Sequence, residues 1–185
     1  MKTAICKVKG ISPLSFSKFI SIKKEEKEGE NAFELRTCRE RMHYDSNGNV
    51  FIPGAMFKNS ISAAAKYLSM QIPGKGKSTY TKNIEAGIMC IENLNLNIHK
   101  DDVEMETLFV PSQGQRGGSK RVPKHFPKIK EWEGYVTFVI IDSIITKEVF
   151  KRHLEEAGSL IGIGRFRPRN NGYYGRFIVE SIEWS

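Results

Sequence analysis

Cysteine is scarce in this sequence. Cys6, Cys38 and Cys90 are the three cysteines among 185 residues, and none lies in a CxxC pair. This scarcity excludes a disulfide framework, and since the four histidines lack metal-ligand spacing the sequence predicts no bound metal.

The longest apolar run, residues 136–141, is far shorter than the roughly 20 residues of a membrane-spanning helix. The N-terminal MKTAICKVKG has lysines where a secretory signal needs an apolar stretch, so we expect a cytoplasmic protein with reduced cysteines and no membrane partner.

Acidic residues are absent from three stretches of the chain. Residues 73–82, 111–130 and 162–177 hold 13 of the 29 basic residues, whereas the rest of the chain has 16 basic and 21 acidic residues. The net charge of +8 therefore comes from these stretches alone. Concentrated positive charge in glycine-bearing segments is typical of a protein whose partner carries phosphate groups. The alternative is a surface that serves only solubility, but such surfaces normally mix both signs.

The stretch GIGRFRPRNNGYYGRF, residues 162–177, combines four arginines, four glycines and four aromatic residues. Arginine forks bind phosphate oxygens and stack on bases, and exposed aromatic rings offer further stacking surfaces. We expect the glycines to let the backbone approach a ligand and to expose amide groups to phosphate. Core packing is the alternative for Phe166 and Phe177, and an ion pair is the alternative for Arg176. The predicted nucleic-acid contacts here are Arg165, Phe166, Arg167, Arg169, Tyr173, Tyr174 and Arg176.

Residues 111–130 form the longest of the three basic stretches. Prolines stiffen this stretch and glycines provide a hinge, so we predict a protruding basic β-hairpin loop inserted into a single domain of residues 1–185. A disordered surface loop is the alternative. The predicted nucleic-acid contacts here are Arg116, Lys120, Arg121 and Lys124. His125 lies in the same stretch, where it is either a further contact or an acid–base group for RNA cleavage.

Hydrophobic periodicity predicts an α+β fold. Helical spacing covers residues 55–70, and Thr146 can cap a second helix. Asn47-Gly48 predicts a tight turn. The predicted strands are residues 3–9, 32–44, 84–98, 103–109, 132–141 and the segment that starts at Phe177. A strand, a helix, two or more strands, a helix and a final strand is the order of a ferredoxin-like (RRM-type) fold, whose antiparallel sheet has two helices on one face.

GKGKST, residues 74–79, contains the GKS of a nucleotide-binding P-loop. That motif needs a glycine at the position of Gln71, and it needs a strand where a helix is predicted here. We therefore predict no nucleotide cofactor, and we assign Lys75 and Lys77 to nucleic-acid contacts instead.

DSNGNVFIPGAMFKNSISAAAK, residues 45–66, resembles a segment of the RAMP superfamily in which a D-x-x-G turn runs into I-P-G and then a helix with two basic residues. Lys58 and Lys66 occupy those basic positions, and the glycines from Gly162 onward resemble the C-terminal glycine-rich loop of that superfamily. The sequence is most similar to the backbone subunits that coat guide RNA in CRISPR effector complexes. Those subunits have a long thumb-like hairpin where this sequence has residues 111–130.

These observations together predict a protein that binds single-stranded nucleic acid, RNA in preference to DNA, with no cofactor and no assigned catalytic residue. We favour a protein without enzymatic activity, whose copies line up along one strand and whose partners include CRISPR effector subunits. Three alternatives stay open. The protein is an endoribonuclease of the same superfamily that processes guide transcripts, a compact or phage-borne relative that mimics or blocks an effector subunit, or a single-stranded DNA-binding protein.

Overall fold

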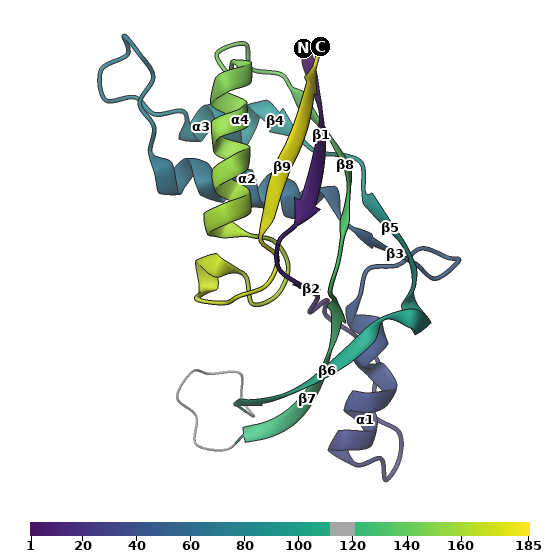
Figure 1. Ribbon diagram of the computed structural model, residues 1–185. Helices are drawn as coiled ribbons and strands as arrows, with labels where there is room; N and C mark the ends of the chain where they lie inside the picture. The colour runs from purple at the N-terminus through teal and green to yellow at the C-terminus, as the bar shows by residue number, and fades with distance from the viewer. Residues whose placement is uncertain (112–120) are drawn as a thin grey trace.

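A four-stranded antiparallel sheet forms the centre of the computed structural model, which describes residues 1–111 and 121–185 (Figure 1). Strand β1 (Lys2–Gly10) lies between β8 (Glu133–Ile140) and β9 (Phe177–Trp184), and β4 (Ile88–Met89) extends the sheet beyond β8. Because side chains alternate along a strand, Ala4, Cys6 and Val8 share one face of β1, and all three are fully buried there.

Helices α2 (Gly54–Leu68) and α4 (Lys147–Glu156) cover this buried face (Figure 1). The ring of Phe150 on α4 meets Phe138 of β8 edge to face, with centroids 5.2 Å apart. Phe57 on α2 packs in the same way against Phe177 of β9 at 5.7 Å. The core elements follow one another along the chain as β1, α2, β4, β8, α4 and β9. Their four strands lie in the sheet in the order β9-β1-β8-β4, which is the ferredoxin-like arrangement. The predicted fold class is confirmed.

Two insertions enlarge this core. Residues 11–53 contain β2 (Leu14–Ser15), α1 (Glu30–Thr37), a 3-10 helix at Cys38–Arg41 and β3 (Asn49–Ile52). Residues 90–132 contain β5 (Leu94–His99), a 3-10 helix at Lys100–Asp102, β6 (Glu104–Pro111) and β7 (Arg121–Ile129). The insertions pair with each other, since β3 pairs with β5 and β2 joins the β6–β7 hairpin. Figure 1 shows the hairpin reaching away from the four-stranded sheet, beside α1.

The partner of β6 differs from the predicted one. Residues 132–141 were expected to pair with residues 103–109, but they form β8 and pair with β1 instead. Strand β7 pairs with β6 from Glu104↔Lys128 to Pro111↔Arg121, although its prolines argued for a loop. Pro123 and Pro127 are four residues apart, so both remove an amide hydrogen from the same edge of β7, and the ladder on the other edge stays intact.

Two other predicted strands contain helices. Helix α1 occupies much of residues 32–44, and polar side-chain contacts stabilise it there. Arg36 donates to the Glu28 carboxylate, and Arg41 donates to the Glu34 carboxylate. Within residues 84–98, α3 (Thr81–Gly87) precedes the short β4, and β5 begins only at Leu94. In both segments the alternation of apolar residues was too brief to separate a strand from one or two helical turns.

The elements with strong local signals agree with the prediction. Strands β1, β6 and β9 and helix α2 lie where the sequence placed them, and the Thr146 hydroxyl accepts a hydrogen bond from the Val149 amide at the start of α4. The Asn47-Gly48 turn is closed by the Gly48 N–H, which donates to the Asp45 carbonyl at 3.0 Å. Over the described ranges, no helix combines the length and the apolar character needed to cross a membrane.

A π-helical turn, Ala157–Ile161, follows α4 and directs the chain into the glycine-rich loop. The buried hydroxyl of Ser60 on α2 lies 3.3 Å from the Ala157 carbonyl oxygen and 3.0 Å from that of Gly162, so its one hydrogen is shared between the first residue of the turn and the residue that follows it. Such turns are often found beside functional sites. Here the turn fixes where the glycine-rich loop leaves the core.

His153 of α4 makes stability depend on pH. Its side chain is fully buried against Tyr80, its Nδ1 lies 2.7 Å from the Val149 carbonyl, and burial lowers its pKa. Burial and the charge of Lys18 lower the pKa of His43 as well. Below the unfolded pKa of about 6.5 the unfolded chain takes up protons that the folded chain does not. We expect the free energy of unfolding to fall as pH decreases from about 6.5 to 5, by at most about 1.4 kcal/mol per pH unit for each histidine.

Urea unfolding at several pH values tests this expectation. His153→Gln removes one titrating group, so it should reduce the change in the free energy of unfolding between pH 6.5 and 5. His43→Gln should reduce the part of that change that His153→Gln leaves. A pH dependence that neither substitution changes would contradict it.

Candidate nucleic-acid interface

The glycine-rich loop, residues 162–176, is bound to the segment that follows β1. The amide of Arg165 donates to the Ser15 carbonyl at 2.8 Å, and the amide of Gly175 donates to the Pro13 carbonyl at 2.8 Å. The Ile11 amide donates in the opposite direction, to the Arg176 carbonyl at 2.9 Å. These backbone bonds fix the loop relative to β1 and β2 without any ligand.

The glycines of this loop serve close packing of the chain on itself. A Cβ on Gly172 would lie 1.8 Å from the Phe166 carbonyl oxygen, and a Cβ on Gly175 would lie 1.9 Å from that of Ile163. The amides of Gly162, Gly172 and Gly175 all donate to carbonyls of the protein. The expectation that they expose amide groups to phosphate is therefore wrong for these three glycines.

Arg165 reaches from the loop to the hairpin and lies between two aromatic rings. Its Cζ is 3.2 Å from the ring centroid of Phe126 on β7 and 3.7 Å from that of Phe166. Burial lowers the pKa of Arg165 to about 10, although the nearby charge of Glu106 opposes this shift, so the group stays protonated at neutral pH. Its Nη1 is buried and has no hydrogen-bond partner in the described part of the chain.

Glu106 of β6 joins the hairpin to the loop by a second route. One carboxylate oxygen accepts from the Tyr174 hydroxyl at 2.6 Å, and the other accepts from the Lys128 ammonium at 2.9 Å. Burial raises the pKa of Glu106, but the hydrogen bonds from Tyr174 and Lys128 outweigh burial and leave its pKa below the ordinary value. One carboxylate thus connects β6, β7 and the glycine-rich loop.

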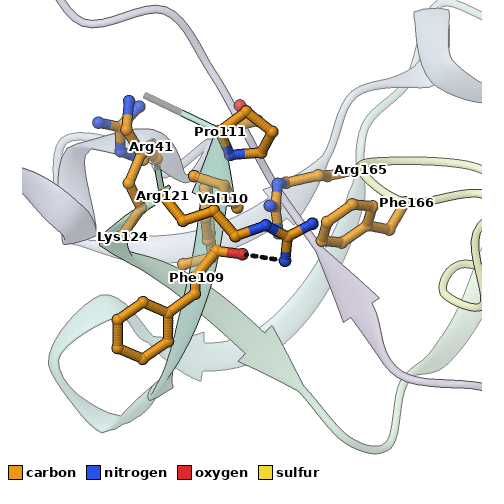
Figure 2. Close-up of a pocket in the computed structure, with 10 residues that line it drawn as sticks. Arg41, Phe109, Val110, Pro111, Arg121, Lys124, Arg165 and Phe166 are labelled. Atoms are coloured by element: carbon orange, nitrogen blue, oxygen red, sulfur yellow. Dashed lines mark hydrogen bonds between the residues drawn. The ribbon is translucent and has the colours of Figure 1, made fainter. Parts of the chain in front are cut away.

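A hollow of about 740 Å³ opens where the hairpin, the loop and residues 17–41 meet (Figure 2). Arg121 crosses it and donates from Nη1 to the Phe109 carbonyl over a long 3.4 Å. The hollow is lined by Ser17, Arg41, Phe109, Val110, Pro111, Arg121, Lys124, Phe126, Arg165 and Phe166. None of these lining residues is acidic.

Two smaller hollows continue from the first. One, of about 350 Å³, shares Ser17, Arg165 and Phe166 with it and adds Lys18 and Arg167. The other, of about 360 Å³, shares Ser17 and Arg41 with the first. Among the residues that line them, again none is acidic, so the three hollows form a continuous basic surface. We call this surface the basic groove.

The basic groove brings together part of the predicted set. Arg121, Lys124, Arg165, Phe166 and Arg167 line it. Tyr174 packs edge to face on Phe166 with centroids 6.3 Å apart, and its neighbour Tyr173 is 61% exposed. Arg116 and Lys120 lie outside the described residues.

Lys18 and Arg41 belong to the basic groove but were missed from the sequence. Both stand in the insertion between β1 and α2, far in sequence from the acid-free stretches. The alternation of Phe16, Lys18 and Phe19 was the one available signal, because aromatic and basic residues interleave there.

Other predicted contacts lie apart from the groove. The half-buried ammonium of Lys58 donates to the Ser62 hydroxyl and to the Ile84 and Glu85 carbonyls, which fastens α2 to α3, and burial lowers its pKa. Lys66 forms a 2.7 Å ion pair with Glu85. Lys75 and Lys77 lie in the loop between α2 and α3, at the end of the molecule opposite the hairpin in Figure 1.

Arg169 and Arg176 belong to the glycine-rich loop but do not line the groove. Arg169 sits on the exposed 3-10 turn Pro168–Asn170. Arg176 donates from Nε to the Ser159 carbonyl at 3.2 Å.

His125 of β7 is buried, with partners at both ring nitrogens. Nδ1 lies 2.8 Å from the Thr107 hydroxyl, and Nε2 lies 3.3 Å from the Asn31 side-chain oxygen. The residue ties the hairpin to α1, so neither nitrogen is free to act on a bound strand. Within the described ranges, no cluster of histidine, cysteine and carboxylate side chains could hold a metal ion.

Comparisons with known proteins show similarity in structure only. No family model and no curated protein sequence matches this chain. The crystal structure of Cmr6 from Pyrococcus furiosus aligns with a TM-score of 0.49 and 14% identity, over 97% of this chain and 99% of that one. A chain of the Type III-B Cmr-beta complex bound to cognate target RNA aligns with a TM-score of 0.51 and 10% identity. This alignment covers 99% of the present chain but 60% of that chain, and it shows a shared fold.

Glu106→Gln should loosen the hairpin from the glycine-rich loop, because the neutral amide holds Tyr174 and Lys128 less strongly than a carboxylate does. We expect a loss of about 1 to 2 kcal/mol in the free energy of unfolding, measured by urea titration. Hydrogen exchange at the β6 amides should also become faster.

Glu104→Gln is the matched control for this substitution. Glu104 forms a 2.7 Å ion pair with Lys130, but both side chains are more than half exposed. Such pairs contribute about 0.5 kcal/mol or less. Equal losses for the two substitutions would show that Glu106 has no special role in holding the hairpin.

Proposed function

We propose that this protein binds single-stranded nucleic acid along the basic groove, RNA in preference to DNA. The observation that supports this proposal is the Arg165 stack, a half-buried cation against two phenylalanine rings at the centre of an acid-free surface. Such a surface offers both positive charge to a phosphate backbone and aromatic faces to unpaired bases.

The charges of the groove are only partly neutralised by the protein. Arg41 pairs with Glu34 at 3.0 Å, and Lys124 lies 3.7 Å from the same residue, so one carboxylate serves two cations. Arg165 and Arg167 both have their pKa lowered by burial, and each has a buried nitrogen without a partner among the described residues. A bound strand would stabilise these cations, since its phosphate groups supply negative charge and its bases supply hydrogen-bond acceptors.

Aromatic side chains stand at the borders of the groove. Phe109 of β6 is 66% exposed at one side of the largest hollow, and Tyr173 is 61% exposed beside Tyr174. Exposed rings next to clustered arginines give unpaired bases flat surfaces on which to stack. Stacking on such rings contributes about 1–3 kcal/mol per base and works for every base.

The structural neighbours favour RNA over DNA as the partner. The chain that shares this fold at a TM-score of 0.51 belongs to a Type III-B Cmr-beta complex bound to cognate target RNA. By this analogy we propose that the protein acts with CRISPR effector subunits in a ribonucleoprotein. The alternating strand and helix order also matches the RRM-type domains that bind single strands.

Salt dependence tests whether the strand follows the basic groove. Lys18→Ala combined with Arg121→Ala removes two exposed cations from different hollows of the groove. The plot of log affinity against log salt for a single-stranded oligonucleotide should flatten by about 1.4, because each lost phosphate contact on a single strand changes the slope by about 0.7. Fluorescence anisotropy with RNA and DNA of the same sequence measures both affinities.

Lys75→Ala combined with Lys77→Ala is the control of equal charge, at the opposite end of the molecule. It should leave the slope unchanged if the strand occupies the groove alone. A flattened slope in this control, with an unchanged slope for the groove variant, would place the strand on the α2–α3 loop and contradict the proposal.

A further inference from the structure

The largest hollow of the basic groove contains hydrogen-bond donors that the protein leaves unpaired. Nη1 of Arg165 and Nε of Arg41 are both buried without partners among the described residues, and both residues line this hollow. Both guanidinium groups also face the ring of Phe126, at 3.2 Å for Arg165 and 5.8 Å for Arg41. Unpaired buried donors are rare in folded proteins, so this pair points to acceptors, from water or from a ligand, that enter beside the two guanidinium groups.

The walls of the hollow suit a nucleobase better than a phosphate group. Val110, Pro111, Phe109 and Phe126 give it a largely apolar lining, and its volume of about 740 Å³ is large enough for a base with its sugar. A phosphate group is small and strongly hydrated, so apolar walls would not stabilise it. A base has two flat apolar faces and a polar edge, which matches apolar walls with a few donors.

The polar groups of the lining select among the bases. The charged side chains are Arg41, Arg121, Lys124 and Arg165, which only donate, and the Ser17 hydroxyl is the one side-chain acceptor among the lining residues. At the edge that arginine reads, adenine places an amino donor beside N7 and cytosine places an amino donor, and neither pattern suits a lining of donors. Guanine presents two neighbouring acceptors, O6 and N7, which an arginine fork meets edge to edge.

The stacking of Arg165 fits this edge-to-edge contact. The rings of Phe126 and Phe166 both lie against its guanidinium group, with centroids 3.2 Å and 3.7 Å from Cζ, so its N–H groups are the part that can bond to a ligand. The rings also hold the fork in one orientation, which increases its selectivity because the donors cannot turn to follow a different acceptor pattern.

We infer that this hollow receives one unpaired base of the bound strand and selects guanine through its O6 and N7 acceptors. The inference rests on the proposed function, because it concerns a base within a strand that the basic groove holds.

Oligonucleotides with single-base changes test the inference on the unaltered protein. The probes are 12-nucleotide RNAs, one of adenosine only and others with one central guanosine, inosine, 7-deazaguanosine or 2-aminopurine. We expect guanosine and inosine to increase the affinity about tenfold or more over the adenosine strand, because both carry O6 and N7. 7-Deazaguanosine lacks N7 and 2-aminopurine lacks O6, so each should lose most of this gain.

Arg165→Lys tests whether Arg165 reads the base. The lysine keeps the charge but lacks the fork, so the affinity ratio of the guanosine strand to the adenosine strand should fall to about one, whatever affinity the variant loses for both strands. Lys77→Arg, in the α2–α3 loop, is the matched control and should keep the preference. Circular dichroism and the urea midpoint establish that each variant is folded.

The outcomes separate this inference from the proposed function. Tight binding of all five strands with equal affinity would overturn the guanine inference and leave the proposed function standing. Failure of every strand to bind would overturn both. A guanosine preference that survives in folded Arg165→Lys would overturn the assignment to this hollow.

Discussion

The position of Arg165 between Phe126 and Phe166 is the contact on which the site depends. This half-buried cation has lost part of its hydration, which the two rings and the nearby charge of Glu106 replace incompletely. The stack holds the hairpin, which belongs to the second insertion, against the glycine-rich loop near the C-terminus. Together with the bonds of Glu106, the stack keeps the basic side chains of the hairpin and of the loop on one continuous surface.

The topology of the central sheet makes this contact available. Because β1 and β9 are neighbours, the segment that leaves β1 and the loop that enters β9 emerge at the same end of the sheet. Backbone bonds from Arg165 to Ser15 and from Gly175 to Pro13 follow from that adjacency. The insertion before β8 then brings β7 to the same place through its pairing with β2. Three segments far apart in sequence therefore meet around one arginine.

Local signals in the sequence identified the elements but not the assembly. The helical spacing of Phe57 and Ile61 and the cap at Thr146 predicted α2 and α4, since these depend on near neighbours in the chain. The role of Arg41 depends on a long-range contact with Phe126, which no local pattern contains. The prolines of β7 concealed a strand, because local preference counted against a pairing that β6 stabilises. The search for stretches without acidic residues identified Arg121 and Arg165 as site residues. It did not show that residues 73–82 lie away from the basic groove.

The double attachment of the hairpin, through Arg165 and through Glu106, also bears on the entropy of binding. The described strands of the hairpin are already in place before a ligand arrives, so ordering them adds little to the entropic cost of association. That cost then falls mainly on the nucleic acid, whose free strand must give up its own stacking and flexibility. The heat and the temperature dependence of binding should therefore reflect the conformational freedom of the strand more than that of the protein.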